Sequence, residues 1–202
     1  MFCSAPDEGK FTELDYPSGP WRDRFFRIGA ARADGTVFPW TPDDGITYVL
    51  PGVDVIKEQA GRRSFETNSS GDAVSREMDV KYETGSSVAT ALAAGLAAMI
   101  IYCVKASILA VKTANQNKGS VVGIAIPDNG ANLISDPDAM KQAFANLGNV
   151  TPNRFVQVWE ELDRVSELLE ASRSRDSNAD VKLKQVEGFV EFGRKLWNSV
   201  KY

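Results

Sequence analysis

The chain has 202 residues, of which 43% are hydrophobic and 25% charged, so it has the composition of an ordinary globular protein of about one domain. Its net charge of −4 argues against nucleic-acid binding, which favours a basic face. It contains no histidine, and so it offers neither a histidine general base nor an imidazole ligand for zinc.

The first part of the chain predicts short strands. Residues 25–31 (FFRIGAA) have the pattern of a buried strand, and residues 46–56 (ITYVLPGVDVI) that of a strand broken by Pro51-Gly52. Residues 57–83 are polar, which predicts a long surface loop. That loop is either a solvated insertion or a segment that contacts substrate or regulates the protein.

An uncharged segment lies between Glu83 and Lys105 and begins with the polar sequence Thr-Gly-Ser-Ser. Its length is just sufficient for a bilayer, which needs about 20 apolar residues. Many of its residues are Ala or Gly, however, and no basic cluster marks one side, so we expect no membrane span. The segment predicts a buried helix over 88–104. The hydroxyls of Ser86 and Ser87 then cap that helix, or one of them is a nucleophile at its N-terminus.

The remaining segments are mostly helical in pattern. Residues 115–119 predict a polar break and 120–126 a short strand, and a helix follows with Asp136 as cap, Pro137 as first residue and Gly148 as stop. Two amphipathic stripes come next, joined by the polar residues 171–180. We expect a helical hairpin that packs against the preceding domain or binds a protein partner. The stripes are Phe155, Val158, Leu162, Val165 and Leu169, and then Val186, Phe189, Leu196 and Val200.

The serine segment carries a family resemblance. GSSVATALAAG, residues 85–95, resembles the serine segment of the subtilisin-like proteases, Gly-Thr-Ser-Met/Val-Ala-Ser/Thr-x-x-x-Ala-Gly, whose third residue is the nucleophile. The resemblance makes Ser87 the nucleophile and Ser86 a structural residue. Further segments are similar to family landmarks in the family's order: FCSAPDEG (2–9) to the strand end with the oxyanion asparagine, RIGAARADG (27–35) to the Val-Gly-Ala strand, ITYVLPGVDV (46–55) to the Ala-Pro-Gly-Val segment, and DPDAMKQAFANLG (136–148) to the next helix.

The resemblance implies a fold and an activity. The fold is α/β, a partial three-layer subtilisin-like fold with a mostly parallel sheet and a buried serine helix, followed by the helical hairpin. Residues 1–150 would form the C-terminal part of a peptidase domain and residues 151–202 an amphipathic tail. The activity is that of a serine endopeptidase that hydrolyses peptides or proteins through Ser87, with Asp7 at the oxyanion-hole position. It needs no cofactor, and the acidic residues before the 136–148 helix lack the spacing of a calcium loop, so we assign no metal.

The chain also departs from the family pattern. The family's triad runs Asp, His, Ser, so its Asp and His would lie upstream of residue 1, and we expect the chain to be inactive alone. Asp7 stands where the family has asparagine, although a convertase branch also has aspartate there. An ionised carboxylate only accepts hydrogen bonds, and it would repel an oxyanion. Pro6 replaces a glycine, and Ala91-Leu92 replaces Pro-His. The alternative function is a non-catalytic binding or scaffold module derived from a protease domain.

Location and solubility follow from weaker signals. Cys3 and Cys103 do not have metal-ligand spacing, and the N-terminus has no apolar core of secretory length, so we expect no disulfide and no signal peptide. The unpaired cysteines and the charged helical tail slightly favour a cytoplasmic location. A half-domain would expose a strand edge and the flank of the serine helix, so we expect poor solubility or dependence on a partner.

Overall fold

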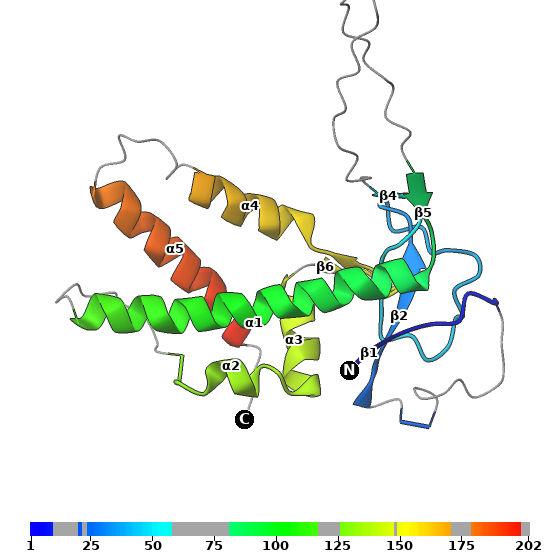
Figure 1. The fold of residues 1–202 in the computed structure, drawn as a ribbon, viewed down its shortest axis with the longest axis horizontal. Coiled ribbons are helices and arrows are strands. Elements are labelled where there is room, and N and C mark those ends of the chain that lie inside the picture. The colour runs from blue at the N-terminus through cyan, green and yellow to red at the C-terminus, as the bar shows by residue number, and fades with distance from the viewer. Residues whose placement is uncertain are drawn as a thin grey trace, which may run out of the picture.

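The structure is a computed structural model, and it describes residues 1–9, 20–21, 24–57, 81–116, 126–147, 149–170 and 179–198. One long helix, α1 (Ser86–Gln116), extends across the molecule, with a small sheet at its N-terminal end and the shorter helices along the rest of its length (Figure 1). Mixed helices and strands with a parallel sheet confirm the α/β class.

The sheet at the start of α1 has three parallel strands in the order β1-β2-β3. The predicted strand at 25–31 is confirmed as the central one. Both faces of the sheet are buried, because Ile28 and Ala30 point towards α1 while Ala31 and Val49 pack against Phe155 on the other face. The strands are β1 (Phe2–Ser4), β2 (Phe26–Ala31) and β3 (Tyr48–Pro51).

The Pro51-Gly52 break separates two strands that belong to different sheets. After it, β4 (Val55–Lys57) pairs antiparallel with β5 (Lys81–Glu83). The single broken strand and the loop over all of 57–83 are therefore wrong predictions, because the ends of that segment pair with each other. Residues 58–80 lie outside the described residues.

Helix α1 is longer than predicted. It begins at Ser86 and continues past Val104 to Gln116, through the start of the predicted polar break. Ile108 explains the extension, because it follows Val104 on the same side of the helix and is buried with it in the main core. Near its C-terminal end, Lys112 forms a 2.8 Å ion pair with Asp128. The strand predicted at 120–126 lies outside the described residues except for Ile126, which is buried without regular structure.

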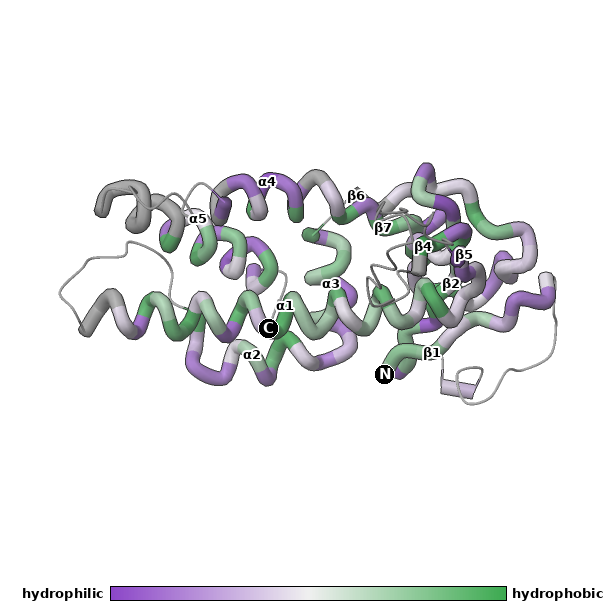
Figure 2. Tube along the Cα trace, turned by 45° about the horizontal axis from the view of Figure 1, so that its top comes forward, coloured by the Kyte–Doolittle hydropathy of each residue, from purple (hydrophilic) through white to green (hydrophobic). Residues whose placement is uncertain are grey.

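The opposite side of α1 is apolar but exposed. Figure 2 shows hydrophobic residues along most of the helix, yet Tyr102 is 67% exposed and Leu109 is 64% exposed. Within the described part of the chain, α1 alone is long and apolar enough to cross a membrane, a property that core helices of soluble proteins share. Only 39% of its most apolar stretch is buried.

The other helices pack around α1. The predicted helix at 136–148 is confirmed, and the Asp138 N–H donates to Asp136 Oδ1 over 3.0 Å at its first turn. Phe155 and Val158 precede α4 instead of lying in it, because Phe155 bridges to Val49 beside the sheet. The second helix begins before the first residue of its predicted stripe. The elements are α2 (Gly130–Leu133), α3 (Pro137–Leu147), β6 (Asn149–Val150), β7 (Val156–Gln157), α4 (Trp159–Glu170) and α5 (Ala179–Trp197).

The C-terminal helices are part of the main core. Phe192, Leu196 and Trp197 of α5 are buried in the same cluster as Ile28 of the sheet and Ile100 of α1. Lys195 Nζ of α5 lies 2.6 Å from Glu161 Oε1 of α4 and joins the two helices. Of the predicted stripe, Leu196 is buried and Phe189 packs against the core, whereas Val186 is 39% exposed and Val200 lies outside the described residues. The packing alternative is therefore confirmed for part of the stripe. A boundary near residue 150 stays a prediction.

The contact between α1 and α5 is unusually close at one glycine. A Cβ added to Gly193 would lie 2.0 Å from Ser107 Oγ and 2.7 Å from Ser107 Cβ. We predict that Gly193→Ala lowers the free energy of unfolding by about 1–3 kcal/mol, because such overpacking forces the two helices apart. Urea unfolding followed by circular dichroism measures the change.

Gly95 provides the matched control, because it lies in α1 with nothing within 4 Å of an added Cβ. Gly95→Ala should raise the free energy of unfolding by about 0.5–1 kcal/mol through helix propensity alone. Equal effects of the two substitutions would contradict the close α1–α5 contact.

The Glu161–Lys195 pair predicts a pH effect. The hydrogen bond from Lys195, with a second from Arg164, holds the pKa of Glu161 below its ordinary value. A lowered folded-state pKa stabilises the fold above the unfolded pKa, and that stability disappears as the pH falls through the folded pKa. Glu161→Gln should therefore cost about 0.5 kcal/mol at pH 7, and progressively less as the pH falls through the unfolded and then the folded pKa, as measured by urea unfolding at a series of pH values. Glu167→Gln, at an exposed position of the same helix, is the control substitution.

Candidate functional site

Two glycines bring the end of β3 against the start of α1. The Gly85 N–H donates to the Gly52 carbonyl over 2.7 Å. A Cβ on Gly52 would lie 2.9 Å from Ala89 Cβ and 2.9 Å from Gly85 O, so only glycine leaves space for this approach. Gly85 has a φ of +147°, a conformation that other residues rarely adopt. The chain therefore turns sharply into α1 directly above the sheet.

Asp7 reaches the same turn from the loop after β1. Its Oδ2 accepts the Ser86 N–H over 2.7 Å, and its Oδ1 accepts the Ser86 hydroxyl over 2.6 Å, across 79 residues of sequence. A carboxylate at this place satisfies a free N–H of the first helical turn and is favoured by the helix dipole. The cap of α1 is thus a distant side chain and not a serine at the helix start.

Ser86 and Ser87 have opposite surroundings. Ser86 is fully buried, whereas Ser87 is exposed. Within the described residues, neither the amide nor the hydroxyl of Ser87 has a hydrogen-bond partner. Ser87 is therefore exposed at the amino end of a helix, where N–H groups favour developing negative charge.

The segments that resemble subtilisin-like landmarks, 2–9, 27–35, 46–55 and 85–95, lie together at one edge of the sheet. The Ala5 N–H donates to Ile28 O, and the Gly52 N–H donates to Ala31 O over 2.9 Å. The carboxyl ends of β1, β2 and β3 therefore meet where α1 begins. In α/β proteins, this edge of a parallel sheet is where sites are built.

Two threonines of the site were missed by the sequence reasoning. Thr84 Oγ1 accepts the Asp54 N–H over 2.9 Å and ties the β4–β5 pair to the turn. The Thr90 hydroxyl donates to Ser86 O over 2.7 Å one turn into α1. A threonine in a helix can donate to the carbonyl four residues earlier, so the spacing of Thr90 from Ser86 is a sequence signal for this bond. Nothing in the sequence around Thr84 indicates its bond to Asp54.

The described site has no base beside the Ser87 hydroxyl. The Ser87 N–H is free to donate, whereas an ionised Asp7 only accepts. Both Asp7 oxygens contact Ser86 and not Ser87, so no described group takes a proton from the Ser87 hydroxyl. The 202 residues contain no histidine that could do so.

Cys103 is a poor alternative nucleophile. Burial raises the pKa of the Cys103 thiol, which disfavours the reactive thiolate. No cluster of three potential metal ligands occurs among those residues.

The comparisons with known proteins add no relative to this description. A scan against protein-family models found no match, and a search of curated proteins also found none. The subtilisin-like interpretation therefore depends on the residues and their geometry.

The Gly52–Gly85 contact makes a prediction for the site. Gly52→Ala should lower the free energy of unfolding by about 2 kcal/mol, because the added Cβ overlaps Ala89 Cβ and the backbone of Gly85. Thermal or urea unfolding measures the loss. The double variant Gly52→Ala/Ala89→Gly removes the overlap with Ala89 Cβ. Once the destabilisation caused by Ala89→Gly alone is subtracted, the double variant should be more stable than Gly52→Ala. No recovery would mean that Ala89 does not limit this approach.

Proposed function

We propose that the chain supplies the nucleophile-bearing part of a subtilisin-like serine endopeptidase domain. The observation that carries the proposal is the position of Ser87, exposed at the amino end of a core helix and at the carboxyl edge of a parallel sheet. Asp7, Gly52 and Gly85 support it, because three segments distant in sequence fix the turn before that serine.

The reaction would be peptide-bond hydrolysis. The Ser87 oxygen attacks the carbonyl carbon of the substrate while a base removes the hydroxyl proton, and the Ser87 N–H donates to the resulting oxyanion. The same base, once protonated, gives its proton to the leaving amine. A histidine in that role has to come from outside these 202 residues. We therefore expect the chain alone to be inactive.

The exposed side of α1 supports a second polypeptide section next to the nucleophile. Ser87, Ala91, Gly95, Ala98 and Tyr102 follow one another along that side, and all are exposed. In the described sheet, β1 pairs on one edge with β2 and no strand covers its other edge. An apolar helix face and a strand edge both favour coverage by further chain. We propose that the section carrying the base packs on this face, in register with Ser87.

A non-catalytic binding module is the second candidate, and Asp7 favours it. A carboxylate that accepts two hydrogen bonds beside the nucleophile opposes the negative charge that acyl transfer develops. In this case a partner would bind α1 or the C-terminal helices, and Ser87→Ala would leave binding unchanged. A polar substitution at Leu196, which is buried in the core, would disturb the fold itself. The binding test therefore needs polar substitutions at exposed positions, namely Tyr102, Leu109 and Val186.

Chemical rescue tests the catalytic proposal. The chain is treated with a fluorophosphonate in the presence of increasing imidazole, which stands in for the absent histidine, and the modified serine is identified by peptide mass spectrometry. We expect modification of Ser87 to be negligible without imidazole and to rise at least tenfold with it, because the exogenous base removes the hydroxyl proton.

The controls lie within the same molecule. Ser4 is an exposed ordinary serine, and its modification should stay at background. Ser87→Ala should abolish the rescued signal and leave the melting temperature within about 2 °C, because an exposed hydroxyl without partners contributes little stability. Equal modification of Ser4 and Ser87 at all imidazole concentrations would reject Ser87 as an activated nucleophile. Rapid modification without imidazole would reject our expectation that the chain is inactive alone.

A further inference from the structure

We propose that Asp7 and Ser86 form a positioning pair that sets the direction of Ser87, and that Asp7 does not act as an oxyanion donor. This inference rests on the proposed function, because it assigns roles to two residues beside its nucleophile. It differs from the resemblance, which would give position 7 the role of donor to the oxyanion.

The hydrogen-bond geometry assigns both oxygens of the carboxylate. Oδ2 accepts from the Ser86 backbone at 2.7 Å and Oδ1 accepts from the Ser86 hydroxyl at 2.6 Å, both short distances for charge-assisted bonds. Each bond uses an acceptor of Asp7 and a donor of Ser86. A carboxylate whose two oxygens both accept hydrogen bonds has no proton to donate to a substrate oxygen.

Burial makes the pair obligatory. The Ser86 side chain is fully buried, so water does not replace its bond to Asp7. A buried hydroxyl or N–H without a partner is costly, and the carboxylate removes both costs at once. A Cβ on Gly85 would lie 3.2 Å from Asp7 Oδ2, so the carboxylate is held close against the turn.

The pair then controls the neighbouring serine through the backbone. Successive residues of a helix point about 100° apart, so a Ser86 fixed towards the interior directs Ser87 outwards. The first turn is held further by the Val88 N–H, which donates to Gly85 O over 3.1 Å. The Ser87 N–H remains free beside its own hydroxyl, and it is the oxyanion donor that the turn presents.

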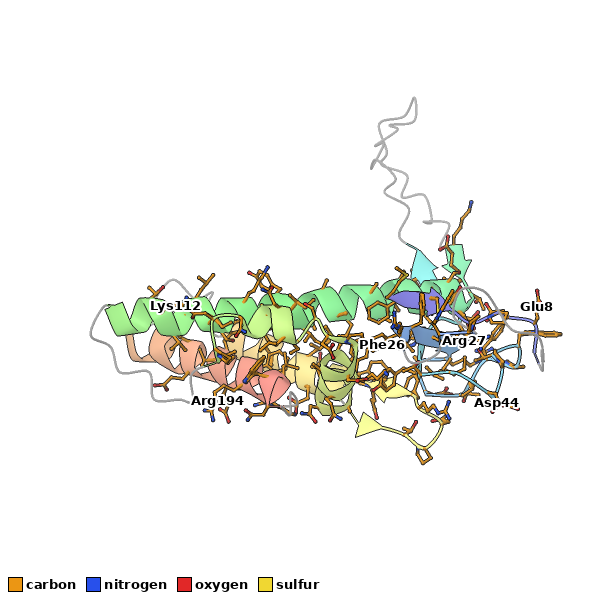
Figure 3. The ribbon with its side chains drawn as sticks, turned by 90° about the horizontal axis from the view of Figure 1, so that it is seen from below. Glu8, Phe26, Arg27, Asp44, Lys112 and Arg194 are labelled. Atoms are coloured by element: carbon orange, nitrogen blue, oxygen red, sulfur yellow. The ribbon has the colours of Figure 1, made fainter. Side chains whose placement is uncertain are left out.

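Amide hydrogen exchange of the folded chain tests the pair without any requirement for activity. We expect Asp7→Ala to speed exchange of the Ser86 amide by about 5- to 10-fold, the factor that corresponds to loss of an N-cap. The Ala97 amide in the middle of α1 should not change. Glu8→Ala is the matched control, because Glu8 is the adjacent carboxylate and its side chain is exposed (Figure 3).

A double-mutant cycle separates a pair from two independent residues. Ser86→Ala removes the hydroxyl bond and keeps the backbone bond, so its effect on the first-turn amides should be smaller than that of Asp7→Ala. In the double variant, the effect should be no larger than that of Asp7→Ala alone. Fully additive effects, or an unchanged Ser86 amide in Asp7→Ala, would overturn the pair.

The imidazole-dependent modification of Ser87 tests its consequence for the nucleophile. Measured well below the melting temperature of each variant, the rate should fall in the order wild type, Asp7→Asn, Asp7→Ala. Asparagine keeps one acceptor oxygen and so keeps part of the pair. A rate in Asp7→Asn that equals or exceeds the wild-type rate would overturn the positioning role of the Asp7 carboxylate. If wild type is not modified at all, the proposed function fails, and the exchange experiment alone still decides whether the pair exists.

Discussion

The close approach of Gly52 to Gly85 is the constraint on which the site depends. Gly52, directly after β3, and Gly85, directly before α1, come within hydrogen-bond distance because Gly52 has no Cβ to overlap the backbone of Gly85. This contact fixes the start of α1 above the carboxyl edge of the parallel sheet. Asp7 then reaches Ser86 from the end of β1. As a result, the adjacent residues Ser86 and Ser87 differ in burial: Ser86 is fully buried and Ser87 is exposed.

Local patterns predicted the elements whose signals lie within one segment. The apolar run 25–31 became β2, and the cap, proline and apolar residues of 136–148 became α3. The predicted end of α1 at Val104 was wrong. Lys105 and Lys112 lie on the exposed side of the helix, while Ile108 continues its buried side. Single charges on a helix face do not end the helix when its other face has a core to join.

Long-range contacts explain what the sequence did not predict. The β4–β5 pair depends on residues separated by a long polar segment, and Phe155 left its helical stripe because it packs beside Val49. Ser87 was selected through a resemblance, and its exposure agrees with that role without testing it. The bonds of Asp7 to Ser86 span 79 residues, a separation over which periodicity and local propensity carry no information.

The two sides of α1 create an imbalance in the fold. One side is buried against the sheet and α5, where Gly193 and Ser107 allow close contact, while the other exposes aromatic and aliphatic side chains. A helix used only as the core of this arrangement would gain stability from polar residues on its outer side. An apolar outer side is favourable only when something covers it, whether a further section of polypeptide or lipid.

The position of Ser87 favours polypeptide over lipid as that cover. Ser87 begins the exposed side of α1, and it lies beside a carboxylate, a free amide and the polar turn of the β4–β5 pair. A membrane would place these polar groups at or below its surface, at a desolvation cost that protein donors and acceptors avoid. A polypeptide that covers the apolar residues further along α1 would leave Ser87 at its border. There Ser87, the proposed nucleophile, would lie within reach of a base on the covering section and remain open to a substrate.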